Sequence, residues 1–180
     1  MRSIFCVLLS FALWASAQGV TADQLASTEQ ASLTSVLNYH RIDASLVTGG
    51  QISPAHVPLL REEGVDLIVN LSVADPERNR DEAFAVASAG ITYVNIPVVW
   101  EAPKREDLDL FLAIMDGAAD KHVLVHCFAN YRASAFTYLH RVLRGGVDER
   151  VARSDLEVVW NDEAWTEYPH WRKFVDEALR

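Results

Sequence analysis

A cysteine and an arginine stand five positions apart in this chain, at Cys127 and Arg132, and His126 directly precedes the cysteine. An apolar run over residues 123–125 leads into these residues, and a helical pattern follows the arginine. The first N–H groups of a helix have no intrahelical acceptor, so a strand, a tight loop and a helix start form an anion-binding cradle. A cysteine beside an arginine in such a cradle is favoured as a thiolate. We therefore expect a nucleophile that attacks an oxyanion such as a phosphate ester.

The elements around this loop are expected to alternate between strand and helix. Strands are predicted at 45–48, 65–71, 91–99 and 123–125. Helices are predicted at 53–64, 75–89, 133–144 and from 105 onward. This alternation predicts an α/β fold whose central, mostly parallel sheet of four to five strands is flanked by helices. Ligand sites of such sheets lie at the carboxyl ends of the strands, where the Cys127 loop and residues 98–103 are expected.

Two helices have faces that can be assigned from apolar spacing. The helix that opens at 105 has these buried-face residues: Leu108, Phe111, Leu112 and Met115. The helix after the cysteine loop is expected to turn these residues inward: Phe136, Leu139, His140 and Leu143.

Residues 147–180 are predicted to form two more helical segments that are rich in aromatic side chains. Aromatic residues at helical spacing favour a cap that covers one face of the sheet. The alternative is that one of the cap tryptophans lines the pocket. We expect a single domain over 18–180, with a core at 39–146 and the helical cap at 147–180.

The first 17 residues have the parts of a secretory signal peptide. A positive start, an apolar run over 4–14 and a small-residue cleavage motif at 15–17 follow one another. We expect cleavage after residue 17, export to a periplasm or outside the cell, and no membrane span thereafter. Cys6 would leave with this segment, so the exported chain would keep Cys127 as its single thiol. A helix is predicted next, over about 21–37.

The segment from His126 to Arg132 resembles the phosphate-binding loop of cysteine-dependent tyrosine and dual-specificity phosphatases. Upstream, Gly90-Ile91-Thr92-Tyr93 and Ile96-Pro97 follow the order of dual-specificity phosphatases. Two further stretches resemble the bacterial tyrosine-phosphatase-like group that includes the beta-lactamase-hydrolase-like proteins: Gly49-Gly50-Gln51-Ile52-Ser53 and Val69-Asn70-Leu71. The similarity covers roughly residues 39–146.

The resemblance implies a phosphoric monoester hydrolase that works through a phosphocysteine intermediate. It assigns nucleophilic attack to Cys127 and stabilisation of the transferring group to Arg132. It assigns phosphate binding to the loop residues Phe128, Ala129, Asn130 and Tyr131 as well. In the family, His126 would orient the loop, and a buried structural histidine is an equally compatible interpretation. The substrate would be a phosphorylated protein or a small phosphate ester, with no cofactor and no metal.

The loop departs from the family pattern in two ways. Four residues, rather than the usual five, separate Cys127 from Arg132, and the bacterial group with a similarly short loop has glycine at the position of Asn130. Ala133 replaces the hydroxyl residue that follows the arginine in the family. We expect Ser134 to take over the role of easing thiolate departure.

The general acid is also displaced from its family position. The family places an aspartate on the loop after the 91–99 strand, and this chain has Trp100 and Glu101 there. We expect Glu101 to protonate the leaving oxygen. The alternatives are that Glu101 is a solvated loop carboxylate, that Asp75 or Glu77 serves as the acid, or that activated esters react without one.

Composition and charge narrow the class of function. The chain has 180 residues, half of them hydrophobic, which is typical of one domain with a sizeable core. A net charge of -9 gives no support to nucleic-acid binding. The histidines lack metal-ligand spacing, and we find neither a dinucleotide motif nor a nucleotide P-loop. The leading hypothesis is an exported cysteine phosphatase; the alternatives are a catalytically weak anion-binding module of the same fold and a rhodanese-like sulfurtransferase.

Overall fold

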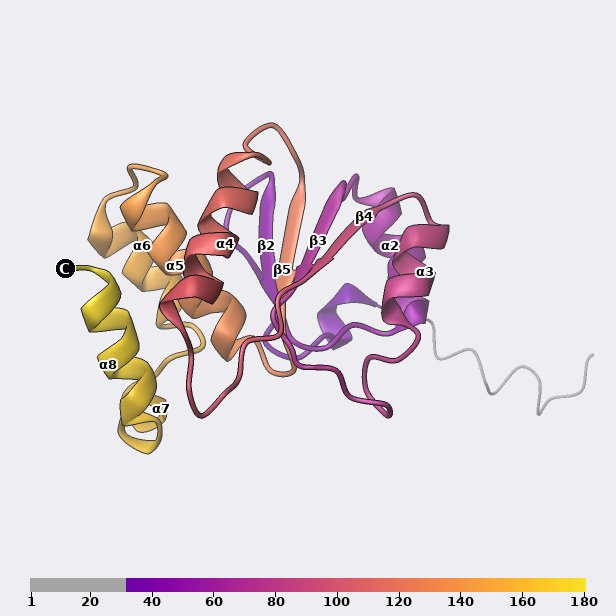
Figure 1. The fold of residues 1–180 in the computed structure, drawn as a ribbon. Coiled ribbons are helices and arrows are strands. Elements are labelled where there is room, and N and C mark those ends of the chain that lie inside the picture. The colour runs from indigo at the N-terminus through magenta and orange to yellow at the C-terminus, as the bar shows by residue number, and fades with distance from the viewer. Residues whose placement is uncertain (1–31) are drawn as a thin grey trace, which may run out of the picture. The chain divides into compact units, whose positions relative to one another are not determined.

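The computed structural model describes residues 32–180, in which helices cover both faces of a central sheet (Figure 1). The sheet has five strands: β1 (His40–Arg41), β2 (Leu46–Gly49), β3 (Leu67–Asn70), β4 (Thr92–Asn95) and β5 (Val123–His126). Their order is β1-β2-β5-β3-β4, and all neighbouring pairs are parallel except β1 with β2. The predicted fold class is confirmed. Because β5 lies at the centre, the cysteine loop leaves the sheet with β2 on one side and β3 on the other.

The helices flank this sheet in two layers. They comprise the 3₁₀ helices η1 (Leu33–Ser35) and η2 (Pro54–His56), then α2 (Val57–Glu62), α3 (Glu82–Ser88), α4 (Arg105–Asp116), α5 (Tyr131–Leu143), α6 (Glu149–Leu156), α7 (Asp162–Glu167) and α8 (Pro169–Ala178). In Figure 1, α2 and α3 lie on one face, while α4 and α5 lie on the other with α6–α8 beyond them. Among residues 32–180, no helix has the length and apolar character that a bilayer span requires.

The predictions for the N-terminal segment lie mostly outside the described residues. This applies to the signal peptide at 1–17 and to most of the helix at 21–37. Where the end of that helix is described, the prediction is wrong, because Leu33–Ser35 is a single 3₁₀ turn and Asn38 has a φ of 51°. Ser32 accepts a hydrogen bond from the Thr34 N–H, and such local bonds compete with helix propagation.

The helix predicted at 75–89 is also shorter than expected. Only its second half, α3, is helical, and Asp75 instead caps a series of turns by accepting from the N–H groups of Glu77 and Arg78. The Asn79 side chain completes these turns by accepting from the Asp75 N–H. Side-chain bonds to the backbone therefore produce turns over residues 75–81 in place of the predicted helix.

Other predicted ends of strands and helices also differ from the observed ones, and the causes are again local. The strand predicted at 91–99 ends at Asn95, two residues before Pro97, which has no N–H for a sheet ladder. The C-terminal region contains three helices rather than two, because Asn161 caps α7 and Pro169 starts α8.

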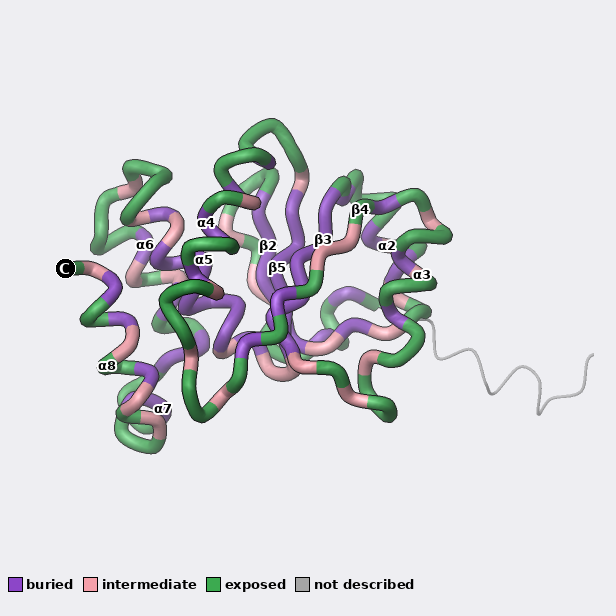
Figure 2. The backbone as a smooth tube through the Cα atoms, viewed as in Figure 1, coloured by how far each residue is buried: buried purple, intermediate pink, exposed green. Residues whose placement is uncertain are grey.

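Buried side chains form one core on each face of the sheet, and the central strands β2, β3 and β5 are buried along their whole length (Figure 2). The larger core lies against α4 and α5 and includes Phe111, Phe136, Trp160 and Trp171. Of the predicted inward residues on α5, Leu143 is the exception at 37% exposed, since it lies in the last turn.

Candidate active site

The loop between β5 and α5 turns within residues 127–130. Asn130 ends the loop with a φ of 68°, in the left-handed region that asparagine tolerates better than most residues. Its buried Nδ2 donates to the Asn38 carbonyl at 2.7 Å and to Thr48 Oγ1 at 3.0 Å. These bonds hold the turn from which α5 begins at Tyr131.

The carbonyl groups of the loop are bound on the side away from the adjoining cavity. The Gln51 N–H donates to the Phe128 carbonyl at 3.1 Å, and Asn38 Nδ2 donates to the Ala129 carbonyl at 3.0 Å. A Cβ on Gly50 would lie 3.1 Å from the Phe128 oxygen, so glycine permits this close approach. The N–H and C=O of one trans peptide group point in opposite directions, so the Ala129 N–H points away from Gln51.

The first turn of α5 adds further N–H groups to this side of the loop. The Ser134 N–H donates to the Asn130 carbonyl at 2.9 Å and is the first intrahelical donor. The N–H groups of Tyr131, Arg132 and Ala133 precede it, so they have no intrahelical acceptor. The helix dipole makes this end favourable for an anion.

Cys127 and Arg132 line one cavity of about 490 Å³ beside these N–H groups. Its lining residues are Val73, Val99, Trp100, Glu101, Cys127, Phe128, Ala129, Tyr131, Arg132 and Tyr168. The Cys127 side chain is buried at the cavity floor. Arg132 Nη1 donates to the Val98 carbonyl at 2.8 Å, and the guanidinium carbon lies 5.2 Å from the centre of the Phe128 ring. The arginine is thus held rigidly while its other N–H groups remain available to an oxyanion.

Glu101 also lines this cavity, from the exposed loop that follows β4. The other carboxylates considered are placed elsewhere. Asp75 lines a separate cavity of about 460 Å³, and Glu77 lines neither cavity. Hydrogen bonds from the N–H groups of Glu77 and Arg78 lower the pKa of Asp75, which outweighs the opposing effect of its burial. Of the predicted acids, Glu101 alone is brought to the cysteine and arginine.

Ser134 does not line the cavity. Its hydroxyl donates to the carbonyls of Asn130 and Tyr131, at 2.7 and 3.2 Å, and its side chain borders a small cavity on the other side with Thr48. Ser134 follows Arg132 by two positions, or roughly 200° around a helix, so the two side chains face different directions. The expectation that Ser134 assists thiolate departure therefore has no support from its position.

His126 is fully buried at the end of β5 and does not line the cavity either. Adjacent strand residues face opposite sides of a sheet, so its ring lies on the face opposite to the Cys127 side chain. Its Nε2 lies 2.9 Å from Glu82 Oε1, and no signal along the chain connects this carboxylate with the loop.

A family model described as a DSP-PTPase phosphatase fused to NAD+ kinase matches residues 17–171, which is most of the chain. The chain belongs to this phosphatase family. The predicted relationship to tyrosine and dual-specificity phosphatases is confirmed, and these enzymes are phosphoric monoester hydrolases. No curated protein sequence shows significant similarity to the chain.

Solved structures agree with the family assignment. A DUF442 protein from Shewanella putrefaciens CN-32, itself described as a candidate phosphatase, is 36% identical with a TM-score of 0.71, over 81% of this chain and 91% of that chain. A cysteine-to-serine variant of TpbA from P. aeruginosa, in complex with phosphotyrosine, is 18% identical with a TM-score of 0.61, over 79% and 88% of the two chains. The core catalytic domain of the PP-IP phosphatase SIW14 from S. cerevisiae, in complex with citrate, is 13% identical with a TM-score of 0.63, over 77% and 83%. The last two similarities show the fold alone.

In this phosphatase, Trp100, Tyr131 and Tyr168 form an aromatic wall along the cavity. The Trp100 ring lies edge-to-face with Tyr168 and Tyr131, at centroid distances of 4.9 and 6.0 Å. The cap supports this wall, because Trp171 Nε1 donates to the Trp100 carbonyl and Trp160 Nε1 donates to the Tyr131 carbonyl. None of the cap tryptophans lines the cavity, so the alternative role predicted for them is wrong.

Tyr168 is the cap residue that does reach the cavity, a role not predicted from the sequence. The available signal was the tyrosine directly before the proline that starts α8, where the chain turns back toward the sheet. Its partner Trp100 occupies the sequence position of the family's acid, and that position does not predict an aromatic contact.

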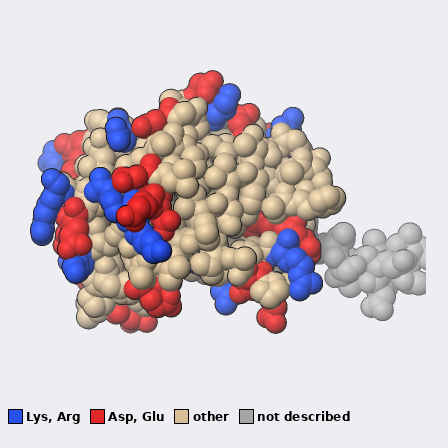
Figure 3. Space-filling view, viewed as in Figure 1, with Lys and Arg blue, Asp and Glu red and all other residues tan. Residues whose placement is uncertain are grey.

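The charges at the cavity are few. One guanidinium, that of Arg132, and one carboxylate, that of Glu101, are the charged groups among its lining residues. On the molecular face drawn in Figure 3, acidic and basic residues are interspersed around a broad uncharged area. Within residues 32–180, no group of three or more His, Cys, Asp or Glu side chains could hold a metal ion.

Proposed function

We propose that the chain is an exported, cysteine-dependent phosphatase that hydrolyses aryl phosphate monoesters through a phosphocysteine on Cys127. The observation that carries this proposal is that Cys127 and Arg132 line one cavity beside the free N–H groups at the start of α5. Export is supported by the signal-peptide pattern of residues 1–17.

The reaction proceeds in two displacements. The Cys127 thiolate attacks phosphorus, so that a P–S bond forms while the ester P–O bond breaks. Arg132 and the loop N–H groups bind the equatorial oxygens, and Glu101 donates its proton to the leaving oxygen. The Glu101 carboxylate then takes a proton from a water molecule, which attacks phosphorus and breaks the P–S bond. Inorganic phosphate leaves, and the thiolate and the protonated Glu101 are restored.

The substrate class follows from what lines the cavity. The aromatic wall offers edge-to-face contacts to a ring, which favours phosphotyrosine or a small aryl phosphate. A polyphosphorylated substrate would require several cations, and Arg132 supplies one. The phosphotyrosine complex of TpbA is consistent with this choice, since that protein has the same fold.

The proposal is tested with purified protein and p-nitrophenyl phosphate. We expect the wild type to release phosphate and Cys127→Ser to release none above background. Rapid quenching of the wild-type reaction should trap a peptide that is phosphorylated on Cys127. Full activity of Cys127→Ser would refute the nucleophile assignment. Binding of inorganic phosphate without turnover, lost in Arg132→Ala, would identify an anion-binding module instead, which the short loop favours. Thiocyanate formation from thiosulfate and cyanide would identify a sulfurtransferase.

Export is tested separately by sequencing the N-terminus of the protein recovered from a bacterial expression host. We expect the mature chain in the periplasm or medium to begin at Gln18. Recovery of an uncleaved chain in the cytoplasm would refute export without affecting the catalytic proposal.

A further inference from the structure

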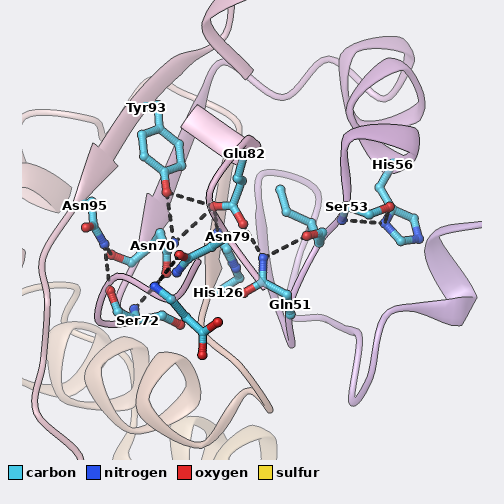
Figure 4. A network of polar contacts seen from close by, with 12 residues as sticks. Gln51, Ser53, His56, Asn70, Ser72, Asn79, Glu82, Tyr93, Asn95 and His126 are labelled. Atoms are coloured by element: carbon cyan, nitrogen blue, oxygen red, sulfur yellow. Dashed lines mark hydrogen bonds and ion pairs between the residues drawn. The ribbon is translucent and has the colours of Figure 1, made fainter. Parts of the chain in front are cut away.

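Figure 4 shows a polar cluster that includes Gln51, Asn70, Tyr93 and His126, none of which lines the cavity. Its centre is Glu82, the first residue of α3, whose side chain is 1% exposed. Glu82 Oε1 accepts from Asn70 Nδ2 at 3.1 Å and from the Tyr93 hydroxyl at 2.8 Å, and Glu82 Oε2 accepts from Gln51 Nε2. A buried carboxylate without partners is strongly unfavourable, so these donors are what permits its charge.

His126 completes this cluster. Its Nε2 lies 2.9 Å from Glu82 Oε1, an ion-pair distance, although the ring N–H is not aligned for a linear hydrogen bond. Glu82 thus places a carboxylate directly against the buried ring of His126.

Two paths lead from Glu82 to the residues on either side of the nucleophile. His126 directly precedes Cys127, and its carbonyl accepts from the Leu71 N–H at 2.8 Å. Gln51 donates through its side chain to Glu82 and through its backbone N–H to the carbonyl of Phe128, which directly follows Cys127. The same carboxylate therefore contacts the side chain of the residue before the cysteine and, through Gln51, the backbone of the residue after it.

We propose that Glu82 is a positioning residue for the phosphatase reaction, acting through His126 and Gln51 on the loop that carries Cys127. It does not touch the substrate, because it does not line the cavity. The inference rests on the proposed function. Misplacement of a reacting group by about 1 Å can cost about 100-fold in rate, so a modest loosening of this loop will be visible in turnover.

The first test compares Glu82→Gln with the control Glu62→Gln. Glutamine keeps the shape of Glu82 and removes its charge, while Glu62 is an exposed residue of α2. Each protein is assayed at a temperature at which its unfolding curve shows it fully folded, so that kcat refers to native molecules. We expect Glu82→Gln to lower kcat for p-nitrophenyl phosphate by about tenfold and to weaken inhibition by orthovanadate similarly. Glu62→Gln should match the wild type.

A double-mutant cycle tests the path through His126. If Glu82 acts through this histidine, adding His126→Gln to Glu82→Gln should cost clearly less than the product of the two single effects. A purely structural role for the glutamate leaves kcat of the folded variant within about twofold of the wild type. That result, or fully multiplicative effects of the two substitutions, overturns the inference.

Alkylation of Cys127 gives a readout that does not depend on turnover. The thiolate displaces iodide from iodoacetate, an anion that the loop attracts, or from neutral iodoacetamide, and mass spectrometry of the Cys127 peptide follows both rates. We expect the ratio of the iodoacetate rate to the iodoacetamide rate to fall about tenfold in Glu82→Gln and to stay unchanged in Glu62→Gln. If the wild type shows no Cys127-dependent turnover, the proposed function fails, and this ratio alone decides the role of Glu82.

A second variant covers the case in which Glu82→Gln does not fold. Tyr93→Phe removes one donor from Glu82 Oε1 and retains the ring and the charge. We expect a smaller decrease of both kcat and the alkylation ratio, and unchanged values of both would overturn the inference.

Discussion

Asn130 stands where the related bacterial group has glycine, and the structure predicts that glycine cannot replace it without cost. Its Nδ2 makes two hydrogen bonds in a fully buried setting, to the Asn38 carbonyl and to Thr48 Oγ1. Asn130→Gly preserves access to a φ of 68° and removes both bonds. At about 1 kcal/mol for each bond, the free energy of unfolding should fall by about 2 kcal/mol.

Asn130→Ala separates the hydrogen bonds from the backbone conformation. Alanine loses the same two bonds, and its Cβ makes the left-handed conformation unfavourable, so we expect a further loss of about 1 kcal/mol relative to Asn130→Gly. The matched control is Asn38→Gly. Asn38 has a similar φ of 51° but is exposed, and its side chain makes one bond, to the Ala129 carbonyl. Its replacement should cost less than about 1 kcal/mol.

Urea unfolding followed by tryptophan fluorescence measures these differences, provided that the m-values agree among the variants. The expected order of stability is wild type, Asn38→Gly, Asn130→Gly and Asn130→Ala. An Asn130→Gly variant as stable as the wild type would show that the two buried bonds contribute nothing. An alanine variant at least as stable as the glycine variant would contradict the left-handed conformation of the loop.

Three further predictions concern the acid, the aromatic wall and the half-buried His140. Glu101→Gln should lower kcat for phenyl phosphate by about 100-fold. The effect on p-nitrophenyl phosphate should be much smaller, because p-nitrophenolate leaves without being protonated. Equal effects on the two substrates would exclude Glu101 as the acid. Tyr168→Ala should raise KM for aryl phosphates about fivefold, from roughly 1 kcal/mol of lost ring contact, and leave KM for alkyl phosphates unchanged. Burial lowers the pKa of His140, although the nearby Asp116 carboxylate opposes this. His140 therefore binds a proton more readily in the unfolded chain than in the folded chain. Lowering the pH below about 6.5 should reduce the free energy of unfolding measured in urea, and the reduction should be smaller in His140→Gln. An identical pH dependence in the two proteins would contradict this.

Much of the fold and the centre of the site follow from local sequence signals. Apolar runs predict the buried strands, and apolar periodicity predicts the helix after Cys127. These two signals are sufficient to locate the strand-loop-helix unit that carries the cysteine and the arginine. The failures were also local in cause. Side chains such as Asp75 and Ser32 bond to nearby backbone, and turns replace part of each predicted helix at these places.

The residues that sequence reasoning missed all reach the site from distant parts of the chain. Tyr168 arrives through the packing of the C-terminal cap on Trp100, and Asn38 holds the Ala129 carbonyl across 91 positions. Glu82 meets His126 because the parallel strands end side by side and α3 lies behind them. No spacing along the sequence signals such contacts.

The sequence by itself determined the chemistry that this protein carries: a single thiol in the described chain, an arginine five positions later and a helix start that together suit an oxyanion. Periodicity and the unpaired N–H groups of a helix start depend only on neighbouring residues, so the sequence is sufficient to predict this oxyanion site. The tertiary structure decided which groups surround the thiol, because burial and the crossing of parallel strands bring together residues that have no relation in sequence. It brought Glu101 and the aromatic wall to the cavity, turned Ser134 away from it, and placed the buried charge of Glu82 behind the loop.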